Sequence, residues 1–226
     1  MEWMVKDKVL TDYLQACKEA DLSNFKRDPR LTKIFEHSNL QQAGDYVAII
    51  YEQKKQWLQF KGWTNDMIGN PKLVYFIPDI EMSASTLQYI GVLSNLITHF
   101  GSLDGKRIVE IGGGYGGQAR TICDVYKPAC YHIIDLYEVT LLQSRYLKEF
   151  DCVDCFTQPT GEEYDLVISN YALSEIPDNK QYMDEVIMKS KHGYITCNTD
   201  FVKLAFEHKR LPDIPSEKAT NYILIW

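Results

Sequence analysis

The stretch VEIGGGYGGQ, residues 109–118, holds five glycines in six consecutive positions. Its first three residues end the charged and apolar run KRIVEI, residues 106–111, which is typical of a buried strand. Downstream, GGQARTICDVY has the pattern of a helix that Pro128 stops. Glycine lets the backbone approach a ligand without interference from a Cβ atom. The stretch therefore predicts a strand and a helix joined by a tight turn, in the place where a ligand would bind.

The rest of the chain repeats this alternation of strands and helices. Only about seven residues, TQPTGEE at 157–163, separate two of the strands, so we expect a plain loop there instead of a crossover helix. Alternating strands and helices predict an α/β fold, a doubly wound and mostly parallel sheet whose ligands bind at the carboxyl ends of the strands. The expected strands lie at 131–135, 152–156, 164–170, 193–198 and 221–226, and the expected helices at 138–150 and 179–191.

The first hundred residues have a different, mainly helical pattern. Apolar residues recur at three- and four-residue spacing in two long stretches, and Ser83 or Ser85 is expected to open a further helix that ends before Gly101. The run LVYFIP at 73–78 fits either a strand or an extended loop. We therefore expect a helical N-terminal extension or cap, residues 1–100, before the sheet of residues 101–226.

Composition excludes several classes of protein. Of 226 residues 45% are hydrophobic and 24% charged, as in ordinary globular chains. A formal net charge of −7 argues against a nucleic-acid partner or an anionic membrane surface. Charges run through the first fourteen residues, and no window resembles a membrane span. We expect a cytoplasmic protein without a membrane span and with reduced cysteines, in which a homo-oligomer is possible and no metal is bound.

Two acidic residues bear on which ligand the turn binds. Gly112, Gly114 and Gly117 match the dinucleotide pattern G-x-G-x-x-G, whose turn presents helix N–H groups to a pyrophosphate. Glu110, however, lies in the apolar strand just before them, and a buried anion there would oppose phosphates. S-adenosylmethionine (SAM), whose amino and sulfonium groups are positive, reverses that argument. Asp135, at the end of its strand, is expected to bind the ribose hydroxyls of either cofactor.

Glu110 followed by Gly112, Gly114 and Gly116 resembles the first motif of class I SAM-dependent methyltransferases, an acidic residue followed by G-x-G-x-G. The resemblance covers about residues 83–226. It implies a Rossmann-like, seven-stranded, mostly parallel sheet with SAM as the cofactor. The residues that we expect at the cofactor are Glu110, Gly112, Gly114, Tyr115, Gly116, Gln118, Asp135, Leu136, Asn170 and Thr86.

Several further stretches resemble one subgroup, the sugar O-methyltransferases associated with surface-glycan and lipopolysaccharide gene clusters. The resemblance implies transfer of a methyl group from SAM to a hydroxyl of a sugar, as a nucleotide sugar or a glycan intermediate. The stretches are GNP at 69–71, SASTLQYI at 83–90, VEIGGGYGGQ at 109–118, ISNYALSEI at 168–176, QYMDEVIMKSKHGYITCN at 181–198 and NYILIW at 221–226.

Methyl transfer is an in-line displacement, so the protein mainly positions the reactants, and a base helps a weakly acidic hydroxyl to react. The expected catalytic residues are Glu175, Tyr171 and Asn198, which follow two neighbouring strands. Glu175 is either the base or an acceptor-binding carboxylate, or only a charge near a helix start. Tyr171 either binds a ligand or belongs to the core. Thr86, with Gln88, either contacts a reactant or serves the helix start.

Other functions remain open on the sequence. The acceptor could be another small hydroxylated metabolite. The literal dinucleotide pattern would fit a nicotinamide-dependent oxidoreductase. A non-catalytic subunit with the same fold would keep the glycine turn without turning over an acceptor.

Overall fold

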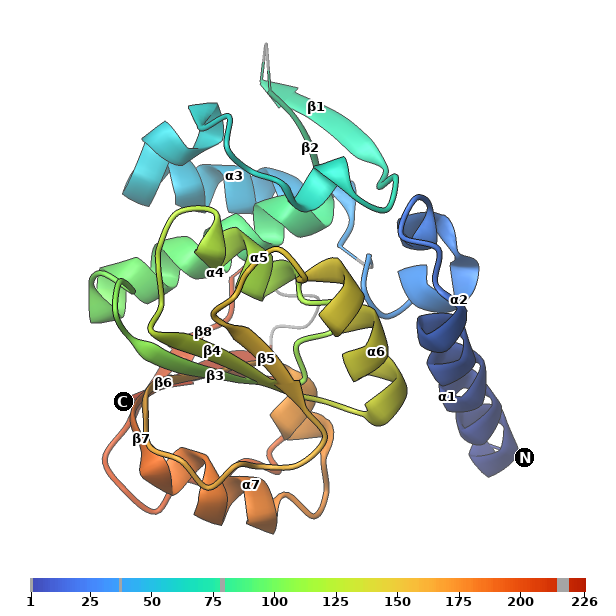
Figure 1. The fold of residues 1–226 in the computed structure, drawn as a ribbon. Coiled ribbons are helices and arrows are strands. Elements are labelled where there is room, and N and C mark those ends of the chain that lie inside the picture. Colours follow the sequence, from blue (N-terminus) through green and yellow to red (C-terminus); the bar gives the residue numbers. More distant parts are fainter. Residues whose placement is uncertain (1, 37, 78–79, 215–219) are drawn as a thin grey trace.

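The computed structural model describes residues 2–36, 38–77, 80–214 and 220–226. Its centre is a seven-stranded sheet in the order β5-β4-β3-β6-β7-β9-β8 (Figure 1). Neighbouring strands run parallel, except that β9 runs antiparallel to both β7 and β8. The predicted mostly parallel sheet is confirmed. Its strands are β3 (Arg107–Ile111), β4 (Cys130–Ile134), β5 (Val153–Phe156), β6 (Tyr164–Asn170), β7 (Ser190–Cys197), β8 (Lys209–Pro212) and β9 (Tyr222–Ile225).

Helices cover both faces of this sheet, as a doubly wound fold requires. Figure 1 shows α4 (Ala84–Phe100), α5 (Gly117–Cys123) and α6 (Tyr137–Tyr146) on one face and α7 (Lys180–Glu185) on the other. Side chains that alternate along a strand enter two separate cores, so Ile108 packs on the α4 side and Val109 on the α7 side. The link between β5 and β6 contains no helix, as its length predicts.

The N-terminal extension lies against the α4 side of the sheet. It contains α1 (Glu2–Glu19), α2 (Pro29–Thr32), α3 (Leu40–Lys54) and an antiparallel hairpin of β1 (Leu73–Ile77) and β2 (Ile80–Ser83). The run at 73–78 is thus a strand over its first five residues. Buried side chains of the extension, such as Leu31 and Ile50, belong to the same hydrophobic core as Ile108. A domain boundary at residue 100 stays a prediction.

A half-buried carboxylate joins this extension to α4. Asp66 accepts hydrogen bonds from the Ser83 N–H (2.8 Å), the Ser83 hydroxyl (2.6 Å) and the Thr86 hydroxyl (2.7 Å). Ser83 is the N-cap of α4, since its Oγ accepts from the Thr86 N–H. The capping role offered for Ser85 is wrong, because Ser85 lies inside the helix. Thr86 therefore serves the helix start and the contact with the extension.

We predict that Asp66→Ala lowers the free energy of unfolding by about 2–3 kcal/mol, because several donors around a charged acceptor lose their partner. Denaturant unfolding monitored by circular dichroism measures the change. Asp45→Ala, which removes an exposed carboxylate from α3, is the control and should change stability by less than about 0.5 kcal/mol. Equal effects of the two substitutions would contradict the role given to Asp66.

Candidate active site

The glycine turn between β3 and α5 takes a conformation that only glycine adopts easily. Gly112, Gly114 and Gly116 have φ angles of +72°, +57° and +97°. A Cβ atom on Gly112 would lie 2.0 Å from the Cβ of Ala172, which follows β6. The turn is thus packed tightly against the segment that follows β6. Its backbone is exposed to whatever lies beside the turn, because glycine has no side chain to cover it.

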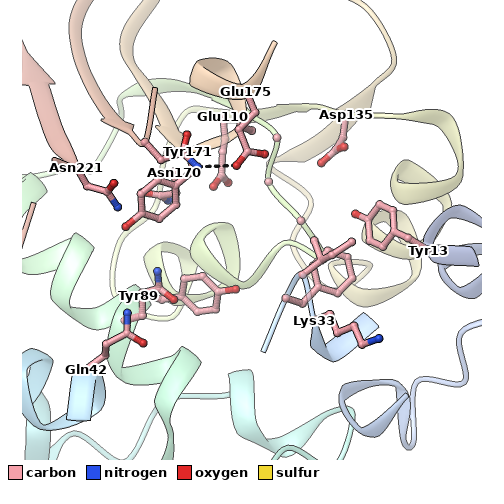
Figure 2. A pocket seen from close by; sticks show the side chains of 18 of the residues that line it. Tyr13, Lys33, Gln42, Tyr89, Glu110, Asp135, Asn170, Tyr171, Glu175 and Asn221 are labelled. Atoms are coloured by element: carbon pink, nitrogen blue, oxygen red, sulfur yellow. Dashed lines mark hydrogen bonds between the residues drawn. The ribbon is translucent and has the colours of Figure 1, made fainter. Parts of the chain in front are cut away.

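A hollow of about 420 Å³ lies at the carboxyl ends of β3, β4, β6 and β7. The extension closes its other side, so the site is built from both parts of the chain. Figure 2 shows Glu110, Asp135 and Glu175 on one side of this pocket and Gln42 and Tyr89 on the other. The predicted site residues that line it are Glu110, Gly112, Gly114, Asp135, Asn170, Tyr171, Glu175 and Asn198.

Glu110 is a buried carboxylate without a cation beside it. Its side chain is 2% exposed, and the Tyr131 hydroxyl donates to its Oε2 at 2.8 Å. Burial raises the pKa of Glu110 to about 7, and the hydrogen bond from Tyr131 offsets part of that rise. Within the described ranges, none of the ion pairs includes Glu110.

Asp135 follows β4 and faces the same pocket. Its carboxylate accepts hydrogen bonds from the Leu136 N–H (2.8 Å) and from the Gln143 amide (3.0 Å). Burial still raises the pKa of Asp135 to about 6. The N–H groups of Gly113 and Gly114 lower the pKa of Asp135 in part, so the glycine turn favours a carboxylate of the protein itself.

The pair of carboxylates sets the chemistry of this side of the pocket. Carboxylates that lie beside a pocket without cations favour a ligand that brings hydrogen-bond donors or positive charge, and they oppose a pyrophosphate. Lys33, on the extension, is the one lysine or arginine among the lining residues that the structure describes, and its side chain is exposed. The electrostatics therefore disfavour a dinucleotide.

Backbone strain marks the part of the pocket wall that follows β6. Tyr171 follows β6 with a φ of +70°, which is costly for a residue with a side chain and is typical of functional sites. Two bonds hold it there: its N–H donates to the Thr196 carbonyl at 3.0 Å, and its hydroxyl donates to Asp213 at 2.6 Å. Burial raises the pKa of Tyr171 above its ordinary value, so this phenol stays protonated.

Glu175 lies next to Tyr171 in the short 3₁₀ helix Ala172–Glu175. The amide of Asn198, just after β7, donates to its Oε1 at 2.6 Å (Figure 2, dashed line). Glu175 itself is exposed. The three residues predicted to be catalytic thus line one pocket, with Glu175 oriented by Asn198.

Five residues expected at the cofactor do not line this pocket. Tyr115 is fully buried among aromatic rings, because the turn points its side chain into the core. The Gln118 amide donates to a backbone carbonyl of α4, and Thr86 faces Asp66. Gly116 packs against Leu147 as the N-cap of α5, and Leu136 is half exposed. The motif predicts that these residues lie near the site, but the packing of the fold determines the direction in which their side chains point.

Several lining residues escaped the sequence analysis. Most come from the extension, whose docking has no local signal: Tyr13, Phe35, Gln42 and Tyr46. Tyr89 directly follows Gln88, which the sequence did indicate. Asn221 lies just before β9. It reaches the pocket because β9 runs backwards, and so begins at the edge where the parallel strands end.

The strand order, with its single reversed strand next to the edge, is that of class I methyltransferases, and the chain has this fold. Comparison with sequence families and with curated proteins finds no match. Solved structures that resemble the chain include a SAM-dependent methyltransferase from Mesorhizobium loti (19% identity, 46% of this chain and 51% of that one, TM-score 0.38). An rRNA methylase from Streptococcus thermophilus has 10% identity, covers 60% and 93%, and has a TM-score of 0.46.

A candidate sarcosine dimethylglycine methyltransferase from Galdieria sulphuraria has 19% identity over 55% of this chain and 53% of that one, with a TM-score of 0.44. The chain thus spans about half the length of the first structures it matches. The absence of a nucleic-acid partner stays a prediction. Across the described residues, no helix has the length and apolarity to cross a membrane, and no cluster of three or more His, Cys, Asp or Glu could hold a metal.

We predict that Gly112→Ala destabilises the protein by about 2–4 kcal/mol, from backbone strain plus the clash with Ala172. Gly105→Ala is a matched control, since Gly105 also has a positive φ (+67°) but a Cβ there meets no atom within 4 Å. The control should cost only about 1–2 kcal/mol. Thermal and urea unfolding measure both, and equal losses would show that the close approach at Gly112 contributes nothing.

Proposed function

We propose that this protein transfers the methyl group of SAM to a hydroxyl group of a sugar. The observation that carries the proposal is the pair of carboxylates beside the glycine turn, the buried Glu110 and the half-buried Asp135, which have no compensating cation among the described residues. A ligand with a cationic end and a ribose suits both groups. The resemblance of the sequence to sugar O-methyltransferases supports the acceptor class.

The residues present fit SAM. The Asp135 carboxylate accepts one hydrogen bond at each oxygen, from the Leu136 N–H and the Gln143 amide, and so has oxygen lone pairs left for the ribose hydroxyls. Glu110 is available to a positively charged group of the ligand, and that contact would favour its ionised form. When bound, SAM supplies an activated methyl group that is transferred to the acceptor oxygen. The turn, packed without room for a Cβ, leaves its backbone in contact with the ligand.

The pocket is also suited to hydroxyl groups. Amide side chains, which both donate and accept hydrogen bonds, line it: Gln42, Gln88, Asn170, Asn198 and Asn221. Tyr171 is a donor there and no base, since its hydroxyl is committed to Asp213 and burial keeps its pKa raised. Glu175 takes the proton of the acceptor hydroxyl and, being exposed, passes it to water. Asn198 fixes the orientation of Glu175.

We predict that the affinity for SAM rises between pH 6 and pH 8. The pKa values of Glu110 and Asp135 are raised to about 7 and about 6, so both groups lose their protons over this range and become able to bind a cation and two hydroxyls. Glu110→Gln should weaken SAM binding at least tenfold at pH 8, about 1.4 kcal/mol, and should flatten the pH dependence. Isothermal titration calorimetry measures both.

Glu207→Gln, which alters an exposed carboxylate away from the pocket, is the control and should bind SAM as the parent chain does. A lack of SAM binding at millimolar concentration would contradict the proposal. So would tight binding of NAD that Glu110→Gln leaves intact.

We predict that Glu175→Gln lowers kcat for methyl transfer by about 100-fold or more, since it removes the proton acceptor and leaves the cofactor side unchanged. The assay follows label from methyl-labelled SAM into free sugars, methyl glycosides, disaccharides and nucleotide sugars. Affinity for SAM should stay constant. Glu163→Gln, an exposed carboxylate at the opposite end of β6, is the control. If no sugar of any kind accepts a methyl group, the acceptor class is wrong.

A further inference from the structure

A second hollow, of about 460 Å³, adjoins the first. It lies where β7 ends and where β8 and β9 meet the same edge of the sheet, because the reversed β9 begins there. Asn198 and Asn221 line both hollows, so the two meet at these side chains. The described residues thus form two adjoining compartments, of which only the first contains the carboxylate pair.

Asn221, at the junction, has a buried atom without a partner. Its side chain is 8% exposed and hydrogen-bonds with Asp213 and Tyr171, to which its amide NH₂ donates. Its Oδ1 accepts no hydrogen bond from any described residue. Buried polar atoms are almost always paired, and this acceptor, which solvent does not reach in the free protein, gains a partner when the Asn221 amide turns toward a ligand with a donor group. Figure 2 shows Asn221 next to Tyr171 at this side of the pocket.

The size of the first hollow indicates where the acceptor lies. At about 420 Å³ it is near the lower end of the range for one ligand of drug size, about 300–1,000 Å³. Direct methyl transfer requires two reactants in contact. If the cofactor fills the part of the first hollow near Glu110 and Asp135, the reacting part of the acceptor lies at the junction of the two hollows. The remainder of the acceptor then extends into the second hollow.

The lining of the second hollow selects the chemistry of that remainder. Thr199, Thr220 and Asn221 offer uncharged hydrogen-bonding groups. The hollow has one cation among its described lining residues, Arg210, which stacks 3.4 Å over the Tyr222 ring and lies near an acidic side chain, Asp200, at 3.9 Å. A diphosphate would need more positive charge than this balanced pair supplies. A neutral, hydroxylated ring matches the donors and acceptors present.

We propose that the second hollow binds a second sugar ring of the acceptor and that a hydroxyl of the acceptor donates to Asn221 Oδ1. The natural acceptor is then a glycan of at least two rings and not a nucleotide sugar. This inference rests on the proposed sugar methylation. It gives Asn221 a specificity role that is separate from the cofactor residues.

The test compares four kinds of probe: methyl monosaccharides, the corresponding methyl disaccharides, UDP-glucose and dTDP-rhamnose. Calorimetry on the protein saturated with S-adenosylhomocysteine gives Kd, and labelled SAM gives KM. In at least one sugar series the disaccharide should have a Kd and a KM at least tenfold lower than its monosaccharide. The nucleotide sugars should have no such advantage.

Two substitutions at Asn221 separate ligand binding from support of Tyr171. Asn221→Leu removes the acceptor oxygen and should raise the Kd and KM of the disaccharide at least tenfold. Asn221→Asp keeps an accepting oxygen and places a second carboxyl group against Asp213; one of the two carboxyls then keeps a proton and replaces the lost NH₂ donor, so the values should stay within about threefold of the parent. SAM affinity should be the same in both variants. If both variants lose the disaccharide equally, Asn221 only supports Tyr171 and Asp213, and the proposal is overturned.

Thr220→Trp, which fills the second hollow from its exposed rim, tests the subsite without altering Asn221. It should lower disaccharide binding to the level of the monosaccharide, whereas Glu52→Trp on the exposed side of α3 should not. Equal use of one and two rings, or a preference for nucleotide sugars, overturns this inference while sugar methylation stands. Methylation of no probe overturns the proposed function itself, and the inference with it.

Discussion

The site depends on keeping two carboxylates, one buried and one half-buried, next to a turn of glycines. Glu110 is held by a tyrosine hydroxyl, and Asp135 by the Leu136 N–H and the Gln143 amide. Neither has a cation beside it among the described residues, and burial raises both pKa values. Such an arrangement costs stability in the free protein, and a ligand that pairs with both groups offsets the cost. These two carboxylates select the ligand more than the glycines do, because the glycines only allow a close approach of the backbone.

Topology then brings the second reactant to the same place. Parallel strands end at one edge of the sheet, so Asp135, Tyr171 and Asn198 meet there although they are distant in sequence. The reversed β9 adds Asn221 from its beginning, and β8 adds Asp213 from its end. The strained backbone of Tyr171 is held by hydrogen bonds to Thr196 in β7 and to Asp213 after β8. The N-terminal extension closes the pocket from the opposite side.

The sequence predicted the features that depend on neighbours along the chain. The strand–turn–helix unit, the alternation of elements and the position of Glu110 are local patterns, and the structure confirms the sheet. The direction of individual side chains was less predictable. Tyr115 and Gln118 belong to the same motif, yet packing directs their side chains away from the pocket. Asn221 could not be foreseen, because nothing in NYILIW indicates that its strand runs backwards.

The most direct test of the central claim is a crystal structure of the protein with S-adenosylhomocysteine. We predict that both hydroxyls of the ribose lie within hydrogen-bond distance of Asp135 and that the amino group of the ligand lies on the side of Glu110. The space between the ligand sulfur and the acceptor residues Glu175 and Asn221 should stay unfilled by the ligand. A ligand bound elsewhere, or a pyrophosphate seated on the glycine turn with both carboxylates displaced, would contradict the account.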